Sequence, residues 1–311
     1  MTAGARAGVT AAAAMAVTLA LAAACSTWRA PAVSAPLAEP LAYRAPYAKE
    51  PPAIGGSLEQ GAWAGAPWTD DFVDIEGDRR PRPAYRTRAK MLWDERFLYV
   101  GAQLEEPHVW SSLREHDQIV FQDNDFEAFI DPDGDGREYY EIEINARGTV
   151  FDLFLHRSYR DGAPAIHEWD VGGAFARSIA FDGTPDDSRD VDRGWTVMLA
   201  IPWDAFVPPR DPRIDALPAG QRDFGDRARG GAAPRAGDTW RINFSRVQWR
   251  HNHERLDAAG ARILPAAAGD GTPYAKRAGL PEDNWVWTPQ WAVDMHLPQH
   301  WGRVTFEDRR P

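Results

Sequence analysis

The residues best suited to chemistry in this chain lie in the stretch 124–155, where carboxylates and an amide recur at alternate positions. Within 139–145, Glu141, Glu143 and Asn145 alternate with apolar residues. Successive side chains of a β-strand point to opposite faces, so these three polar groups share one face while the apolar residues point to the core. The pattern predicts a sheet surface that recognises a polar ligand.

The preceding segment, 125–131, alternates in the same way. Asp125, Glu127 and Asp131 share one face, and Phe129 is the apolar residue that interrupts it. Two neighbouring strands of this kind would present a shared acidic surface. Antiparallel sheets routinely expose one polar face to water, so simple solvation is the alternative for each of these acids.

An aspartate-rich turn joins the two segments. Asp131, Asp133 and Asp135 occupy alternate positions of DPDGDG. Carboxylates with this spacing can converge on Ca²⁺, and glycine permits the turn. The spacing is similar to the first half of an EF-hand loop, but Ile142 stands at the twelfth position, where a bidentate glutamate is needed. The sequence therefore predicts either a calcium site formed by the three aspartates or a hairpin in which they serve the turn alone.

The start of the chain predicts export. Residues 1–25 contain Arg6, then an apolar run, and end in the single cysteine, Cys25, which is typical of a signal peptide. The LAAAC stretch is similar to a bacterial lipoprotein box, which predicts lipidation of Cys25 and attachment to the outer membrane or cell surface. Cleavage near Ala24, giving a secreted or periplasmic protein, is the alternative. One cysteine excludes an intramolecular disulfide.

Composition and strand patterns predict the architecture. The 46 acidic and 35 basic residues give a net charge of −11 without a basic stripe, so nucleic acid is not an expected partner. Residues 26–53 are rich in Ala and Pro, which favours a stalk. Short strand patterns dominate 54–308. They predict an all-β, antiparallel, jelly-roll-like β-sandwich, a single domain with long surface loops over 205–237 and 257–283.

The 14 tryptophans fall into two groups. Trp93, Trp195 and Trp240 lie within strand patterns and are expected in the core. Others lie near strand ends or in loops, where an exposed ring could stack on a sugar or fill an interface. This second group comprises Trp110, Trp249, Trp285, Trp287, Trp291 and Trp301. Aromatic rings beside carboxylates and amides are typical of carbohydrate recognition.

Several motifs, taken together and in order, resemble the family 9 carbohydrate-binding modules and their stand-alone relatives. They extend from about residue 54 to residue 306 and comprise MLWDERFLYVGAQLEEP, DNDFEAFIDPDGD, YYEIEIN, GWTVMLAIPW, WRINFSRV and WVWTPQWAVDMHLPQHWG. The resemblance implies an antiparallel β-sandwich with structural calcium. It also implies sugar recognition, which in characterised members occurs at the reducing end between two tryptophans.

The resemblance also implies ligand-binding positions. The first sandwiching tryptophan aligns near Phe121 and the second near Met295. A binding-face asparagine matches Asn145, whereas the family's arginine two residues earlier is Glu143 here, which reverses a charge. The polar face of WRINFSRV offers further contacts. The complete set of predicted ligand-binding residues is Phe121, Glu143, Asn145, Asn243, Ser245, Trp287 and Trp291.

These features predict a protein that captures poly- or oligosaccharide, such as xylan or cellulose, in polysaccharide catabolism. It would act without cleaving the sugar, beside secreted glycoside hydrolases. Three alternatives stay open. Paired carboxylates on one face could hydrolyse glycosides, Met295 and His296 could ligate haem in a redox β-sandwich, and the protein could be a cell-surface scaffold. Covalent haem attachment through C-x-x-C-H is excluded by the single cysteine.

Overall fold

The computed structural model describes residues 38–162, 165–187, 190–216, 231–251, 255–256, 262–263 and 276–308. From Glu39 on, these residues belong to a compact unit that runs from Glu39 to Pro311. The predicted signal peptide with Cys25 lies outside the described residues, as do parts of both predicted surface loops. Within the described part of the chain, no helix has the length and apolar character needed to cross a membrane.

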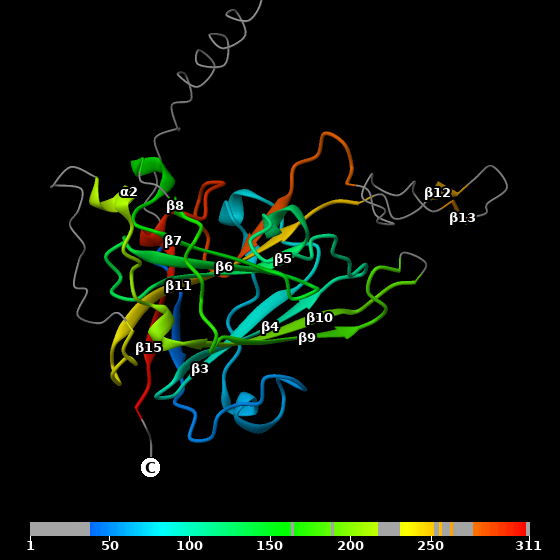
Figure 1. The fold of residues 1–311 in the computed structure, drawn as a ribbon. Coiled ribbons are helices and arrows are strands. Elements are labelled where there is room, and N and C mark those ends of the chain that lie inside the picture. Colours follow the sequence, from blue (N-terminus) through cyan, green and yellow to red (C-terminus); the bar gives the residue numbers. More distant parts are fainter. Residues whose placement is uncertain are drawn as a thin grey trace, which may run out of the picture. The chain divides into compact units, whose positions relative to one another are not determined.

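Two packed β-sheets form the unit, which confirms the predicted all-β sandwich (Figure 1). The larger sheet has nine strands. Its main order is β1 (Ala42–Ala45), β15 (Gly302–Phe306), β11 (Thr239–Gln248), β5 (Asp125–Asp131), β6 (Tyr139–Asn145), β7 (Val150–Leu155) and β8 (Ala165–Ile166). Beside this path, β14 (Asp283–Val286) pairs with β11, and β2 (Val73–Asp74) pairs with β14. The pairing is antiparallel except between β1 and β15.

The smaller sheet has four strands in the order β3 (Thr87–Trp93), β4 (Phe97–Glu105), β10 (Gly194–Pro202) and β9 (Ala176–Asp182). A separate hairpin pairs β12 (Arg255–Leu256) with β13 (Arg262–Ile263). The helical segments are short: η1 (Gly61–Gly65), η2 (Gly77–Arg79), η3 (Val120–Gln122), η4 (Tyr159–Asp161), η5 (Trp203–Ala205), α2 (Pro212–Asp215) and η8 (Pro298–His300). The helices therefore serve as connectors, and the sheets carry the fold.

The main core lies between the two sheets. Ile142 and Ile144 of β6 are fully buried there, and Val100 and Val197 of the smaller sheet belong to the same apolar cluster. Burying a side chain of this kind stabilises the fold by about 2 kcal/mol. The tryptophans predicted for the core are confirmed in it, since Trp93, Trp195 and Trp240 are each at most 3% exposed.

The other tryptophans are more buried than the sequence suggests. Four of the six expected at the surface are at most 4% exposed, namely Trp110, Trp285, Trp287 and Trp301. The prediction of exposed rings is wrong for these four. A second apolar cluster covers part of the outer face of the larger sheet, where Trp301 packs 5.5 Å from Phe129. Because both faces of this sheet carry apolar layers, aromatic residues near strand ends are buried.

The segment predicted as a stalk contributes a strand to the sheet. Within 26–53, β1 pairs in parallel with β15, with Ala42 opposite Arg303. Tyr43 and Ala45 point into the main core and are 5% and 0% exposed. Alternation of exposed and buried side chains makes this segment a strand, although its Ala and Pro content favoured an extended linker. A fragment that begins at residue 50 would lack this strand.

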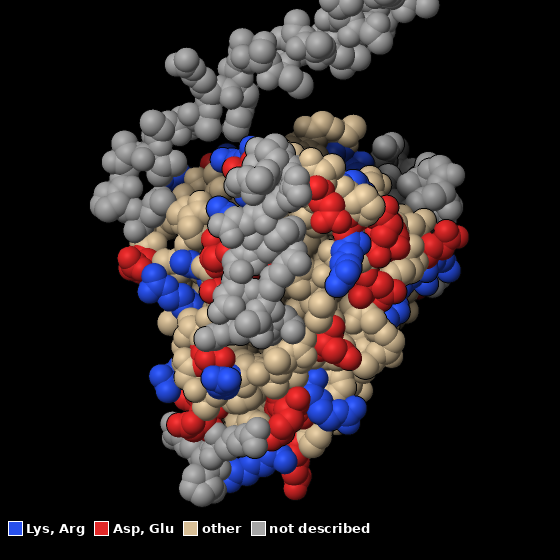
Figure 2. All heavy atoms as spheres, turned by 60° about the vertical axis from the view of Figure 1, so that its left-hand side comes forward, with Lys and Arg blue, Asp and Glu red and all other residues tan. Residues whose placement is uncertain are grey.

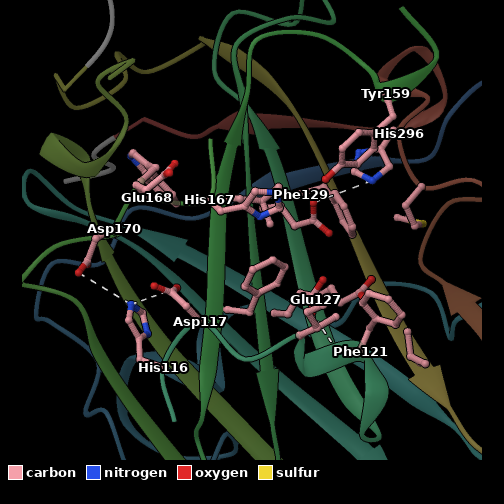
Figure 3. A pocket seen from close by; sticks show the side chains of 18 of the residues that line it. His116, Asp117, Phe121, Glu127, Phe129, Tyr159, His167, Glu168, Asp170 and His296 are labelled. Atoms are coloured by element: carbon pink, nitrogen blue, oxygen red, sulfur yellow. Dashed lines mark hydrogen bonds and ion pairs between the residues drawn. The ribbon is translucent and has the colours of Figure 1, made fainter. Parts of the chain in front are cut away.

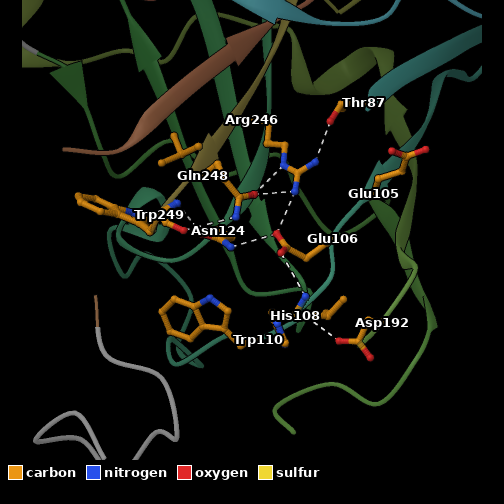
Figure 4. A network of polar contacts seen from close by, with 12 residues as sticks. Thr87, Glu105, Glu106, His108, Trp110, Asn124, Asp192, Arg246, Gln248 and Trp249 are labelled. Atoms are coloured by element: carbon orange, nitrogen blue, oxygen red, sulfur yellow. Dashed lines mark hydrogen bonds and ion pairs between the residues drawn. The ribbon is translucent and has the colours of Figure 1, made fainter. Parts of the chain in front are cut away.

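A buried ion pair ties the two sheets together (Figure 4). Arg246 of β11 donates to Glu106 at 2.9 Å and to the Thr87 hydroxyl of β3 at 2.9 Å. Gln248 accepts a third hydrogen bond from the guanidinium at 3.0 Å, and Asn124 donates to the same Glu106 oxygen at 3.1 Å. Burial raises the pKa of Glu106 and lowers the pKa of Arg246, while each partner's charge opposes the shift. Hydrogen bonds to both the guanidinium and the carboxylate therefore stabilise this ion pair in the interior.

The visible surface is mixed in charge. On the face drawn in Figure 2, Lys and Arg side chains are interspersed with Asp and Glu. Neither sign of charge dominates the face that is drawn.

Candidate functional site

A cavity of about 750 Å³ lies over the outer face of the larger sheet. Strands β5, β6 and β7 form its floor, and the segments around residues 116–121, 159–170 and 282–296 form its walls. Aromatic residues line it on several sides, namely Phe121, Phe129, Phe151, Tyr159 and Trp169. Acidic residues line it as well, namely Asp117, Glu127, Glu141, Glu143, Glu168, Asp170 and Glu282. Figure 3 shows how several of these side chains surround the cavity.

Strand register brings the central carboxyl groups together. Glu127 of β5 lies opposite Ser245 of β11 on one side and Glu143 of β6 on the other. Glu143 in turn lies opposite Phe151 of β7, so one row of the sheet ends in an aromatic ring. Carboxylate oxygens of Asp125, Glu127 and Glu143 lie within 4.8 Å of one another. The alternation read from the sequence therefore does produce a shared acidic face.

Burial changes the protonation of this acidic face. The pKa of Glu127 rises to about 7 because the side chain is buried. Burial, reinforced by the neighbouring carboxylates, raises the pKa of Asp125, Glu141 and Glu143 well above the usual range. Burial therefore shifts each of these groups toward the neutral carboxylic acid. In that form a carboxyl group both donates and accepts hydrogen bonds, as a hydroxyl-bearing ligand requires.

One glutamate also holds an aromatic residue at the rim of the cavity. Glu143 accepts a hydrogen bond from the backbone N–H of Phe121 at 2.9 Å. Phe121 lies in η3 and is 39% exposed, which is high for a large apolar side chain. The contact places an exposed ring beside the buried carboxyl group, and this combination suits the apolar face and the hydroxyls of one sugar unit.

His296 forms part of the opposite wall. Its Nδ1 lies 3.0 Å from the hydroxyl of Tyr139, and its ring packs edge-on against Tyr159 at 4.5 Å. Burial lowers its pKa to about 4, so the imidazole is neutral near pH 7. Met295 precedes it and lines the same cavity. Adjacent residues on one wall do not reach both faces of a haem, so the arrangement does not match the axial pair of the redox alternative.

Comparison with known proteins supports the resemblance read from the sequence. Residues 54–162 match the model of the family described as "Carbohydrate family 9 binding domain-like". The resemblance to family 9 is thereby confirmed. The matched segment contains η3 and strands β3 to β7, and so it includes most of the cavity floor. Among curated proteins, the search finds no match to this chain.

One solved structure shows the same fold, and two others are similar to this chain. A candidate carbohydrate-binding protein from Bacteroides uniformis ATCC 8492 is 16% identical, with a TM-score of 0.55 over 86% of this chain and 99% of its own. A family 9 carbohydrate-binding module from Caldicellulosiruptor kristjanssonii was solved with cellotriose and with glucose. These two structures are 13% and 14% identical, with TM-scores of 0.45, and cover 86% of this chain and 94% and 97% of theirs.

The structure brings some of the predicted family 9 ligand positions together. Phe121 and Glu143 line the cavity, and Ser245 lies one strand away, opposite Glu127. Asn145 and Asn243 are fully buried outside the lining. Asn145 accepts from the backbone N–H groups of residues 147 and 149 and donates to Asp123. Asn243 is bonded to both backbone groups of residue 288. Both side-chain amides therefore hydrogen-bond backbone groups of the protein itself.

The two tryptophans predicted as stacking platforms lie elsewhere. Trp287 is 1% exposed and packs in the main core, near Phe244 at 6.0 Å. Trp291 is half-buried outside the lining, with its ring against the backbone of Gly77 and the guanidinium of Arg79 5.5 Å from its centre. The aromatic walls come from phenylalanine and tyrosine in other segments.

The aspartate hairpin brings its three carboxylates together. Oxygens of Asp131, Asp133 and Asp135 lie within 4.8 Å of one another. Asp131 also accepts hydrogen bonds from the backbone of Gly134 and Gly136, both at 2.9 Å. The all-oxygen donor set fits Ca²⁺, and the same groups perform the turn chemistry. Calcium at this hairpin stays a prediction.

Sequence reasoning missed several cavity residues. Glu127 and Glu141 were recognised on the polar face but not as ligand contacts, although their alternation with Phe126 and Ile142 was a usable signal. Tyr159 and His167 come from connecting segments without a regular pattern. No spacing in the sequence indicates that such residues meet over the sheet.

Proposed function

We propose that this cavity binds carbohydrate and that the protein captures poly- or oligosaccharide without cleaving it. The observation that carries the proposal is the convergence of aromatic rings and buried carboxyl groups in a cavity of about 750 Å³. Aromatic rings contact the C–H face of a sugar, and the carboxyl groups bond its hydroxyls. The match of residues 54–162 to a carbohydrate-binding family supports the same role.

The charge of the cavity favours a neutral sugar over an acidic one. Its lining residues include seven carboxyl groups and, among the described residues, neither lysine nor arginine. The family's arginine is replaced by Glu143, so a uronic acid would meet no cation there, and it would face the exposed carboxylates of Glu168 and Asp170. We expect cellotriose to bind and trigalacturonate not to bind.

Burial of the central carboxyl groups supports binding without hydrolysis. A glycosidase needs one carboxyl group that is protonated and another that is ionised, with pKa values pushed apart. Here burial raises the pKa of Asp125, Glu127, Glu141 and Glu143 alike. No member of this group is held ionised by a lowered pKa. Incubation with cellotriose should therefore leave the sugar intact.

The experiment that tests the function is calorimetric titration of the full chain with glucose, cellotriose and xylotriose. Phe121→Ala should weaken binding, because it removes the exposed ring at the rim. Phe181→Ala is the matched control, because Phe181 is 40% exposed in β9, outside this cavity. Absence of heat with every sugar in the wild type would refute the proposal, and so would equal binding by Phe121→Ala.

The place of action proposed here is the outer membrane or cell surface, where captured polysaccharide would be offered to secreted glycoside hydrolases. The support is the sequence of residues 1–25 and the LAAAC stretch. A fatty-acid label should enter the wild-type protein and be lost in Cys25→Ala. Release of unlabelled wild-type protein into the medium would instead favour simple secretion.

Structural calcium at the aspartate hairpin completes the proposal. Ca²⁺ would screen the repulsion among Asp131, Asp133 and Asp135, so the melting temperature should rise on adding Ca²⁺ and fall on chelation. Asp133→Asn, which changes an exposed carboxylate of the hairpin, should abolish this response. An equal response in the variant would place the calcium elsewhere.

A further inference from the structure

Four side chains with metal-ligating atoms meet at one edge of the cavity. His116 and Asp117 belong to the connection between β4 and β5, Asp152 to β7, and Asp170 to the connection between β8 and β9. Figure 3 shows His116 directed toward Asp117 and Asp170. Three separate segments of the chain therefore supply this group, and three of its members, His116, Asp117 and Asp170, also line the cavity.

The atoms have the spacing of a coordination shell. His116 Nε2 lies 3.4 Å from Asp117 Oδ1, 3.5 Å from Asp152 Oδ1 and 3.9 Å from Asp170 Oδ2. These distances exceed those of ordinary hydrogen bonds, which are about 2.7–3.2 Å. Ligands of a tetrahedral zinc ion, at bond lengths of about 2.0–2.1 Å, lie about 3.4 Å from one another. The ligating atoms of His116, Asp152 and Asp170 all lie within 4.8 Å of one another.

A buried oxygen in this group has no hydrogen-bond donor. Asp152 is 0% exposed, and its Oδ2 accepts a hydrogen bond from the backbone N–H of Val171 at 2.6 Å. Its Oδ1 accepts none from the described residues and faces His116 Nε2. Leaving a buried carboxylate oxygen unsatisfied is costly, and the neighbouring strand and Val171 hold it in place. A cation bound at this oxygen would remove the cost.

The backbone fixes the two residues that face this oxygen. The N–H of Asp117 donates to the carbonyl of Val150 at the start of β7, at 3.0 Å, which ties their connection to the strand that carries Asp152. His116 and Asp117 are each 48% exposed, and Asp170 is 66% exposed, so solvent reaches the outer side of the group. An ion can therefore enter from the cavity and meet the buried oxygen at its base.

We propose that His116, Asp152 and Asp170 bind a divalent transition-metal ion, with Zn²⁺ as the best match. One imidazole nitrogen and two carboxylate oxygens are a mixed donor set, which suits zinc, whereas calcium prefers six to eight oxygen ligands. The ion also neutralises the two carboxylate charges. The site is distinct from the all-oxygen aspartate hairpin and lies at the edge of the cavity that we propose for sugar.

The test is titration of the chelator-treated full chain with Zn²⁺ by calorimetry and with Co²⁺ by visible absorption. One equivalent of Co²⁺ should give the intense bands of a tetrahedral complex, and Zn²⁺ should displace them. His116→Ala and Asp170→Asn should each weaken Zn²⁺ binding by at least about tenfold. Asp170 is largely exposed, so that variant tests the site without disturbing the core.

Two control variants separate this site from its neighbours. His167→Gln removes another histidine of the cavity lining, and Asp135→Asn alters the aspartate hairpin. Both should bind Zn²⁺ and Co²⁺ as the wild type does. Octahedral Co²⁺ spectra in the wild type, or unchanged Zn²⁺ affinity in both His116→Ala and Asp170→Asn, would overturn the proposal.

Discussion

The buried carboxyl group of Glu127 should make the stability of this protein fall as the pH rises. Its pKa is about 7 in the folded protein because burial disfavours the charged form, compared with 4.5 when unfolded. Between these values the folded state binds the proton and the unfolded state does not. Unfolding is therefore favoured as the pH increases, and the stabilisation present below pH 4.5 is lost as the pH passes through about 7.

The size of the effect follows from the two pKa values. Each unit of pKa difference corresponds to about 1.36 kcal/mol, so Glu127 alone should account for about 3 kcal/mol between pH 4.5 and pH 8. Asp125, Glu141 and Glu143 have raised pKa values too and act in the same direction. Glu127→Gln keeps the shape of the side chain and removes its titratable group. Over the same pH range, the unfolding free energy of this variant should therefore fall by about 3 kcal/mol less than that of the wild type.

Urea unfolding of the wild type and of Glu127→Gln at pH 5 and pH 8 measures this effect. The contribution of Glu127 is the change in unfolding free energy of the wild type between the two pH values minus the same change in the variant. Exposed Glu115→Gln is the matched control and should follow the wild type. The reasoning is refuted if Glu127→Gln loses as much stability as the wild type between the two pH values. Constant m-values would show that the comparison concerns the same unfolding transition.

Three further substitutions test the packing and the site. Trp287→Ala should destabilise the protein by about 3–5 kcal/mol, because the ring is fully buried in the core. Urea unfolding measures this change in stability, and a loss below about 1 kcal/mol would contradict the prediction. Glu106→Gln should cost about 3–5 kcal/mol by leaving the Arg246 guanidinium buried and unpaired, whereas replacing both by apolar residues should cost less. Phe121→Ala should weaken cellotriose binding by about tenfold and leave the melting temperature unchanged, since an aromatic contact contributes about 0.5–1.5 kcal/mol. A melting temperature that falls with the affinity would mean that Phe121 acts through the fold.

The strands could be predicted from the sequence wherever alternation was strict. Residues 139–145 form β6 with the expected bounds. Alternation reports the two faces of a strand directly, because it depends on local geometry alone. The exposure of the tryptophan side chains was harder to predict, because it depends on whether a second layer of residues covers the end of the strand. Trp287 and Trp301 lie under such layers.

The candidate site was predictable only in part, for a related reason. Glu143 was found because it lies on an alternating strand, and Phe121 because it aligns near a sandwiching tryptophan of the family that the chain resembles. Asn145 was chosen for its polar face, but an amide at the end of a strand often bonds the following turn, as it does here. Residues such as Tyr159 and His296 come into contact only in the folded protein, so no local sequence pattern predicts their contact.

The pairing of β1 with β15 has a consequence for how the protein reaches its final structure. Ala42 begins to pair opposite Arg303, so this strand receives its partner only after residue 303 has been synthesised. Contacts between residues so distant in sequence form late, because closing a long loop loses conformational entropy before the contact contributes any stabilising free energy. Hairpins such as β3–β4 and β5–β6 can form first. The edge that joins the two ends of the unit should therefore be the closing step of folding, and a ribosome that stops before residue 302 would release a chain whose first strand has no partner.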